Sequence, residues 1–147
     1  MAGTRTIDQN DREKGLTRMS ALPTPVDPPA LVRSPAFAQG MIAPAGPTLY
    51  VGGQNGIDGD GVLRDGLGPQ TEQALRNVLA VLDAAGSGPE YVVKLTIHLD
   101  PSIDPTDAYA ATRTVWGDHR TAVTVLAVAP ANPGALVEIE AVAVLRG

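Results

Sequence analysis

Cysteine is absent from the 147-residue chain, which excludes disulfides, thiolate nucleophiles, zinc fingers and iron–sulfur clusters. The absence also suits a reducing compartment. Aromatic residues are scarce at 3%, although hydrophobic residues make up 44% of the chain, so the core must consist of Val, Leu, Ile and Ala. A chain of this length forms one domain and buries about two thirds of its unfolded surface, so it needs no disulfide or metal for stability.

Basic residues are also too few to balance the acidic ones. Lys and Arg number 11 against 16 Asp and Glu, which gives a net charge of −5 at pH 7. Nucleic acid is not an expected partner, because phosphate binding needs a local excess of Lys and Arg. No apolar run reaches the ~18 residues of a membrane span, and the N-terminus lacks the apolar core of a signal peptide. We therefore expect a cytoplasmic location and no membrane partner.

Residues 1–30 differ in composition from the rest of the chain. They are polar and charged, then rich in proline, and they show neither a helical nor a strand period. This composition predicts a disordered or variable N-terminal tail, with a functional arm as the alternative. Met19 lies inside this segment, so either Met1 or Met19 can be the true start.

The remaining residues, 31–147, carry the periodic patterns of a folded domain. A helix is predicted over residues 69–85, because Pro69 suits the first helical position, Gly86 suits the residue after the end, and an apolar stripe with helical spacing lies between them. A second helix is predicted over 104–118. Strands are predicted over 31–33, 39–43, 48–52, 91–99, 122–129 and 136–145. The strands at 39–43 and 48–52 are expected to form a hairpin around a Pro/Gly turn.

This order, β-β-β-α-β-α-β-β, predicts an α+β fold, a mixed sheet with both helices on one face. Along residues 91–99 the alternation places Val93, Leu95, Ile97 and Leu99 on one face and Lys94, Thr96 and His98 on the other. The second face also receives Glu138, Glu140, Val142 and Val144 from the last strand. Because this open face is mixed apolar and polar, we expect another subunit to cover it.

Several segments resemble the Rid family, the YjgF-like reactive intermediate deaminases. They are TEQALRNV at 71–78, VLDAAG at 81–86, VVK at 92–94 and GALVEIEA at 134–141. Gly52-Gly53-Gln54 is similar to the family's Ser-Gly-Gln motif, and residues 35–39 are similar to its Pro-Tyr-Ser-Gln segment. The resemblance runs from about residue 34 to residue 146 and implies a chorismate-mutase-like (YjgF-like) single domain. It also implies a homotrimer with ligand clefts between subunits.

The resemblance further implies that active members hydrolyse 2-imino or enamine acids to a keto acid and ammonia, with no cofactor and no metal. Such a reaction needs an anchor for the substrate carboxylate, a positioned water at the imine carbon, and a hydrogen-bond partner for the leaving nitrogen. Glu138 matches the family carboxylate that orients the water. Glu140 is interpreted as a solvated or interface charge.

Three further residues match the family's ligand site. Gly53 stands where the motif lets the backbone approach the ligand, and Gln54 is expected at the strand end or the pocket wall. A simple turn is the alternative for both. Phe37 stands where the family has a tyrosine, so the ring is kept and the hydroxyl is lost.

The chain departs from the family at Val123. The family motif reads His-Arg-Pro-Ala-Arg-Ser-Thr, and its second arginine anchors the carboxylate. Residues 119–125 here read HRTAVTV, so Val123 stands in place of that arginine, with Val125 two residues further along the same expected site. Loss of a charge-assisted fork costs about 3 kcal/mol, or roughly a hundredfold in affinity. Arg120 reaches the cleft only if the chain bends locally, because an offset of three along a strand reverses the face.

Two classes of function therefore stay open. The first is a Rid-type enzyme that hydrolyses a small reactive imine or enamine. Glu138 and Gly53 favour this interpretation. The second is a non-catalytic trimer that binds a metabolite or a protein. Val123 favours this interpretation. A chorismate mutase needs more cationic groups than this cleft offers, and a ribonuclease fits poorly with the acidic charge and the lack of a histidine pair.

Overall fold

The computed structural model describes residues 21–146, so most of the predicted tail, including Met19, lies outside the described residues. Regular structure begins earlier than residue 31, with strand β1 (Thr24–Val26). β1 pairs antiparallel with β2 (Gly40–Ile42) in a small two-stranded sheet, in which Pro25 stands opposite Met41. A proline is tolerated there because β1 is an edge strand with an unpaired outer side.

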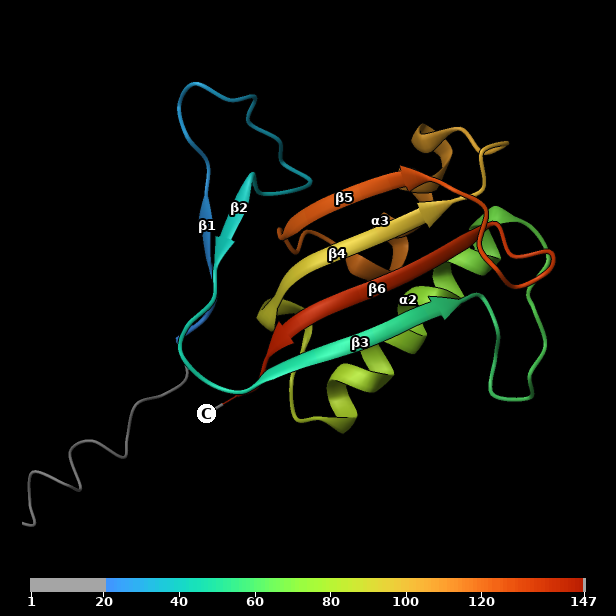
Figure 1. The fold of residues 1–147 in the computed structure, drawn as a ribbon, viewed down its shortest axis with the longest axis horizontal. Coiled ribbons are helices and arrows are strands. Elements are labelled where there is room, and N and C mark those ends of the chain that lie inside the picture. Colours follow the sequence, from blue (N-terminus) through green and yellow to red (C-terminus); the bar gives the residue numbers. More distant parts are fainter. Residues whose placement is uncertain (1–20, 147) are drawn as a thin grey trace, which may run out of the picture.

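One strand prediction and one pairing prediction in this region were wrong, whereas the strands predicted at 39–43 and 48–52 are confirmed as β2 and β3. Residues 31–33 form no strand; they lie in the loop between β1 and β2. The expected hairpin between 39–43 and 48–52 is also absent, because β2 pairs with β1, whereas β3 (Thr48–Asn55) pairs with the last strand of the chain. The Pro/Gly segment after β2 therefore carries the chain from one sheet to the other (Figure 1).

The main sheet contains four strands in the order β3-β6-β4-β5. The remaining three are β4 (Val92–Leu99), β5 (Ala122–Ala127) and β6 (Val137–Val144). β6 runs antiparallel to both of its neighbours, while β4 and β5 are parallel. The sheet is therefore mixed, and β3 and β5 are its two edges, as Figure 1 shows.

Both helices pack on one face of this sheet (Figure 1), which confirms the predicted α+β architecture. The longer helix, α2 (Leu67–Ala84), begins two residues before the predicted start at Pro69 and ends before Gly86, whose φ of +70° suits glycine. The shorter helix, α3 (Pro105–Trp116), starts with Pro105 in its first turn, and the Asp104 carboxylate accepts a hydrogen bond from the Thr106 amide at 2.8 Å. A single 3₁₀ turn, η1 (Pro89–Tyr91), precedes β4.

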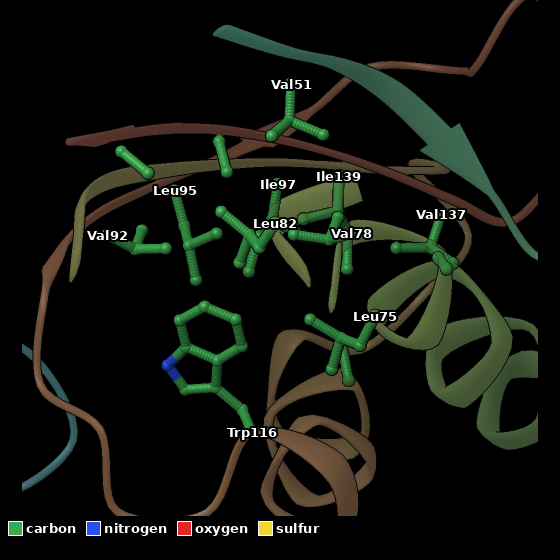
Figure 2. Close-up of a cluster of buried hydrophobic side chains, with 14 of the residues drawn as sticks. Val51, Leu75, Val78, Leu82, Val92, Leu95, Ile97, Trp116, Val137 and Ile139 are labelled. Carbon is green, nitrogen blue, oxygen red and sulfur yellow. The ribbon is translucent and has the colours of Figure 1, made fainter. Parts of the chain in front are cut away.

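The core lies between the sheet and the helices (Figure 2). It is built from aliphatic residues, as expected, with Trp116 of α3 added to them. The apolar stripe predicted for the first helix is confirmed, since its members at 75, 78 and 82 are buried and Leu79 packs against the core. The buried side chains drawn and labelled are Val51, Leu75, Val78, Leu82, Val92, Leu95, Ile97, Trp116, Val137 and Ile139.

The predicted alternation of faces holds for most of β4 and β6 but fails at Val93. The pairing of β4 with β6 shifts register between Val92 and Lys94, so Val92 enters the core in place of Val93. Val144 is buried, but it does not belong to the core cluster between the sheet and the helices. It sits at the end of β6, where its carbonyl accepts a hydrogen bond from the buried Ser87 hydroxyl at 2.8 Å.

Candidate functional site

Glu138 lies near the start of β6, an inner strand next to the edge strand β3, on the open face of the sheet. Its neighbours in β6, Val137 and Ile139, are fully buried on the helix side, so the alternation turns the Glu138 side chain the other way. In register, Glu138 stands beside His98 of β4 and Asn55 of β3. The Nδ1 atom of His98 is buried and has no hydrogen-bond partner among residues 21–146.

A distortion of β3 brings its backbone close to the Glu138 carboxylate. The pairing with β6 shifts register between Val51 and Gln54, so Gly52 and Gly53 form an irregularity of the bulge type. A Cβ atom built on Gly53 would lie 2.8 Å from the Glu138 Cδ atom, whereas one on Gly52 would meet nothing within 4 Å. Only a glycine at position 53 therefore leaves the carboxylate in its place. The Gln54 amide donates to the Gly52 carbonyl at 3.0 Å and so spans this irregularity.

The opposite, helix-covered face contains a cavity of about 250 Å³. It lies between the edge of the sheet at β5, the helix α3 and the loop before β2. Three of the predicted site residues line it: Phe37, Val123 and Val125. Val123 stands next to Leu95 of β4 in register and packs against the core, so this wall is apolar. The other apolar residues in the lining are Pro35, Ala36, Leu75, Leu95, Ile97, Leu99, Pro105, Ala108, Trp116 and Val137.

Few polar groups line this cavity. The charged ones are Arg113 and Asp118, whose Nη2 and Oδ1 atoms lie 3.3 Å apart and whose side chains are 59% and 93% exposed. Thr71 of α2 also belongs to the lining and is fully buried, and its Oγ1 atom has no hydrogen-bond partner in the described part of the chain. Tyr109 and Thr112 complete the polar part of the lining.

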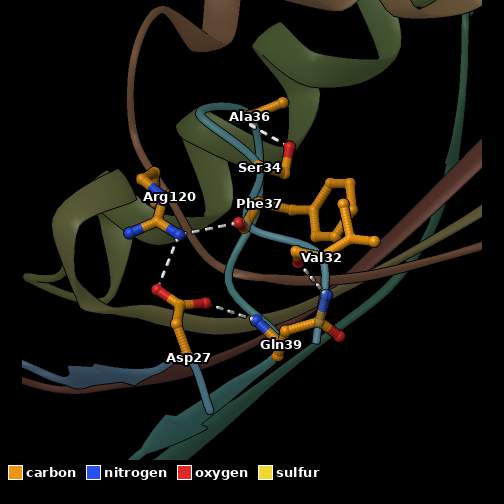
Figure 3. A network of polar contacts seen from close by, with 7 residues as sticks. All are labelled: Asp27, Val32, Ser34, Ala36, Phe37, Gln39 and Arg120. Atoms are coloured by element: carbon orange, nitrogen blue, oxygen red, sulfur yellow. Dashed lines mark hydrogen bonds and ion pairs between the residues drawn. The ribbon is translucent and has the colours of Figure 1, made fainter. Parts of the chain in front are cut away.

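Arg120 does not belong to the lining of this cavity. Its Nη2 atom donates to the Asp27 carboxylate at 2.8 Å and to the Phe37 carbonyl at 2.9 Å (Figure 3). Asp27 also accepts a hydrogen bond from the Gln39 amide at 3.0 Å. The hydrogen bond from Arg120, followed by that from Gln39, holds the pKa of the Asp27 carboxyl below 3.8. This network ties β1 and the loop that carries Phe37 to the start of β5.

The predicted site residues thus form two groups on opposite faces of the sheet. Glu138, Gly53 and Gln54 belong to the first group, near the β3 edge, and the group at the β5 edge consists of Phe37, Val123 and Val125. One chain does not bring the two groups together. Glu140 is exposed on the open face. It lies opposite Thr96 of β4 in register and faces the Gly52–Gly53 irregularity of β3 on its other side.

The sequence-based prediction missed the contribution of α3 to the cavity. The α3 residues of the lining follow a helical period, with spacings of 3, 4, 7, 8 and 11 residues from the first. The helix itself was predicted, over residues 104–118, but no cavity was assigned to it. The α3 residues of the lining are Pro105, Ala108, Tyr109, Thr112, Arg113 and Trp116.

Neither a metal site nor a membrane helix is found in residues 21–146. No group of three or more His, Cys, Asp or Glu side chains there could hold a metal ion. Within the same range, no helix is long and apolar enough to cross a lipid bilayer.

The fold and the divided site define a class of small α+β domains with an apolar cavity at one sheet edge and a carboxylate near the other. A sequence model of the family described as Endoribonuclease L-PSP matches residues 30–145. The RutC family protein PH0854 of Pyrococcus horikoshii is 31% identical over 102 residues, which cover 67% of this chain and 80% of that protein. The chain therefore belongs to this family, the Rid or YjgF-like family, as its sequence motifs indicated.

Solved structures agree with this assignment. The Rid family protein YyfB of Yersinia pestis, a protein of unknown function, superposes on this chain with a TM-score of 0.76 at 30% identity. That match covers 85% of this chain and all of YyfB. RidA of the Antarctic bacterium Psychrobacter superposes with a TM-score of 0.58 at 31% identity, over 80% of this chain and 93% of RidA. The YjgF-like fold is therefore shown by both sequence and structure.

Proposed function

We propose that the protein hydrolyses a small reactive imine or enamine to a carbonyl compound and ammonia. The reaction takes place in a cleft between two subunits of a homotrimer, where the Glu138 face of one subunit meets the cavity of the next. The observation that carries the proposal is the close approach of the Glu138 carboxylate to Gly53, whose bare backbone lets the carboxylate lie against it on the open face.

The reaction requires two things of the protein, a general base and a site that positions the substrate. Glu138 accepts a proton from a water molecule, and the water oxygen bonds to the imine carbon to give a tetrahedral aminoalcohol. Glu138 returns this proton to the nitrogen, which completes the neutral aminoalcohol. It then accepts the hydroxyl proton and delivers it to the same nitrogen, so the carbon–nitrogen bond breaks and ammonia leaves as the carbonyl forms. Water and imine therefore account for all atoms of the two products, and a positioned general base is the main requirement.

The placement of the two half-sites supports an oligomer of cyclic symmetry. They lie toward opposite edges of one sheet, so the β5 side of one copy can meet the β3 side of the next in a head-to-tail contact that closes into a ring. Apolar side chains are exposed at both edges, among them Tyr50 at 76% and Val125 at 49%.

A second candidate, a trimer that binds a metabolite without converting it, is favoured by Val123. Val123 packs against the core where the resemblance implies a carboxylate anchor, and Arg120 is engaged by Asp27 and the Phe37 carbonyl. A binding protein needs the cavity but not Glu138. The two candidates therefore differ in whether the Glu138 carboxylate is required for turnover.

The experiment that separates them measures carbonyl and ammonia release from imines generated in situ by oxidation of amino acids. Glu138→Gln removes the base and keeps the size of the side chain, and Glu140→Gln is the matched control on the same strand. We expect Glu138→Gln to lose nearly all acceleration and Glu140→Gln to retain it. Equal acceleration in wild type and Glu138→Gln would contradict the proposed mechanism, and no acceleration in the wild type would favour the binding protein.

A further inference from the structure

We propose that the cavity selects a ligand with an apolar, ring-sized body and one acidic group, and that Arg113 of α3 binds the acid at the cavity mouth. This inference rests on the proposed function for the identity of the reacting group, but not for the binding itself. It assigns to Arg113, and not to Arg120, the anchoring that Val123 cannot provide.

The size and lining of the cavity define the body of the ligand. An apolar cavity of about 150 Å³ is large enough to bind benzene, and this one measures about 250 Å³. Phe37, Val123 and Trp116 contribute apolar walls. Burial of apolar surface in such a cavity contributes a binding free energy of about 25 cal/mol per Å². An aromatic or branched side chain is therefore favoured over a methyl group.

The charges around the cavity define the acidic group. Arg113 is the only cation in the lining among the described residues, and its partner Asp118 is an almost fully exposed side chain. An ion pair of this kind contributes little to stability, so Arg113 can exchange it for a ligand carboxylate at small cost. Arg120 is not available in this way, because it holds Asp27 and the Phe37 carbonyl together.

Thr71 offers the ligand a second polar contact. A buried hydroxyl without a hydrogen bond is costly, and the Thr71 Oγ1 atom is such a group in the lining of this cavity. Its residue belongs to α2, whereas Arg113 belongs to α3, so the two groups approach the cavity from different elements. Rotation of the Thr71 side chain about χ1 would turn this buried hydroxyl into the cavity, where a phenol on the ring of the ligand would satisfy it.

Trp116 provides the readout that tests this proposal. It is the only tryptophan of the chain and it lines the cavity, so its fluorescence reports occupancy without any turnover. The probes are 3-phenylpropanoate, its uncharged amide, and 3-(4-hydroxyphenyl)propanoate. We expect Arg113→Gln to weaken 3-phenylpropanoate about tenfold or more and to leave the amide unchanged. Arg76→Gln on α2, which removes an exposed arginine outside the lining, is the matched control.

The hydroxylated probe tests Thr71. We expect it to bind wild type several-fold more tightly than 3-phenylpropanoate, and we expect Thr71→Val, which keeps the shape of the side chain, to abolish this difference. Unchanged binding of 3-phenylpropanoate in Arg113→Gln would overturn the role of Arg113, and equal affinities of the two acids in wild type would overturn that of Thr71. Failure of 3-phenylpropanoate to bind wild type at all would overturn the ligand class. Absence of imine turnover would leave these binding results standing, so the two proposals fail separately.

Discussion

Gly53 and the Glu138 carboxylate occupy adjoining space on the open face of the sheet, so that a Cβ atom on residue 53 would stand 2.8 Å from the Glu138 Cδ atom. The register shift of β3 produces this approach, because it places two glycines where a regular strand would place side chains. The glycine is therefore required by the position of the carboxylate and not by a left-handed backbone. A substitution at residue 53 can move the Glu138 carboxylate without removing it.

Gly53→Ala is expected to lower kcat/KM about a hundredfold, because a misplacement of about 1 Å has an effect of this size on a positioned group. The fold should persist, since the clash is with the flexible end of a glutamate side chain. Gly52→Ala is the matched control, because its Cβ atom would meet nothing within 4 Å. Steady-state kinetics of imine hydrolysis, with circular dichroism to verify folding, measures both. Equal activities of the two variants would show that residue 53 does not position Glu138.

Leu82→Ala is expected to lower the free energy of unfolding by about 2–5 kcal/mol, the usual result of truncating a buried leucine. Leu82 is fully buried between α2 and the sheet. Val62→Ala, at a position that is 55% exposed, should change the free energy by less than about 0.5 kcal/mol. Urea unfolding at one fixed protein concentration measures the difference. A small effect of Leu82→Ala would contradict the described core.

Asp27 is expected to make stability depend on pH in the acid range. The Arg120 hydrogen bond and the Gln39 amide lower the pKa of the folded-state carboxyl below 3.8, so Asp27 stabilises the fold fully above that value. This contribution is lost as the pH falls through the lower, folded-state pKa. Asp27→Asn should therefore be less stable than wild type at pH 7, and the difference should shrink below about pH 4. Melting temperatures between pH 2.5 and pH 7 test this, and a constant difference across the range would contradict it.

Arg120 is expected to hold the loop of Phe37 in place. Arg120→Met removes both hydrogen bonds, to Asp27 and to the Phe37 carbonyl, and retains much of the apolar stem. Hydrogen exchange of the Gln39 amide, which donates to Asp27, should become several-fold faster. Arg64→Met, which removes a more exposed ion pair with Asp58, is the control. Unchanged exchange at Gln39 would show that the network does not hold the loop.

The fold could be predicted from the sequence where periodicity was long and unbroken. The helical stripe that contains Leu75 and Leu82 is buried as predicted. The strand period that puts Leu95 and Ile97 on one face also places both side chains correctly in the core. The first strand was missed because Pro25 and the prolines around it resemble the composition of a disordered tail. An edge strand tolerates a proline at this position. The hairpin was wrong because local turn residues do not reveal that a strand pairs with the far end of the chain.

The candidate site could be predicted only residue by residue. Motif positions identified Glu138, Gly53 and Val123, but their separation by the sheet depends on strand register and on the side of the sheet that the helices cover. The engagement of Arg120 was also hidden, because Asp27 lies 93 residues earlier, in the segment interpreted as a tail. The α3 wall of the cavity was readable as a helical stripe, but nothing in the sequence says which stripe faces an open space.

The most direct test of the account is the activity of mixed oligomers, because its central claim is that one subunit supplies Glu138 and another supplies the cavity. Glu138→Gln lacks the base, and Val125→Trp blocks the cavity mouth; each alone should be inactive. When the two variants are unfolded together in equal amounts and refolded, about one quarter of the head-to-tail sites should combine two intact halves. We predict that imine hydrolysis returns to about a quarter of the wild-type rate. No recovery in verified mixed oligomers would contradict a site shared between subunits.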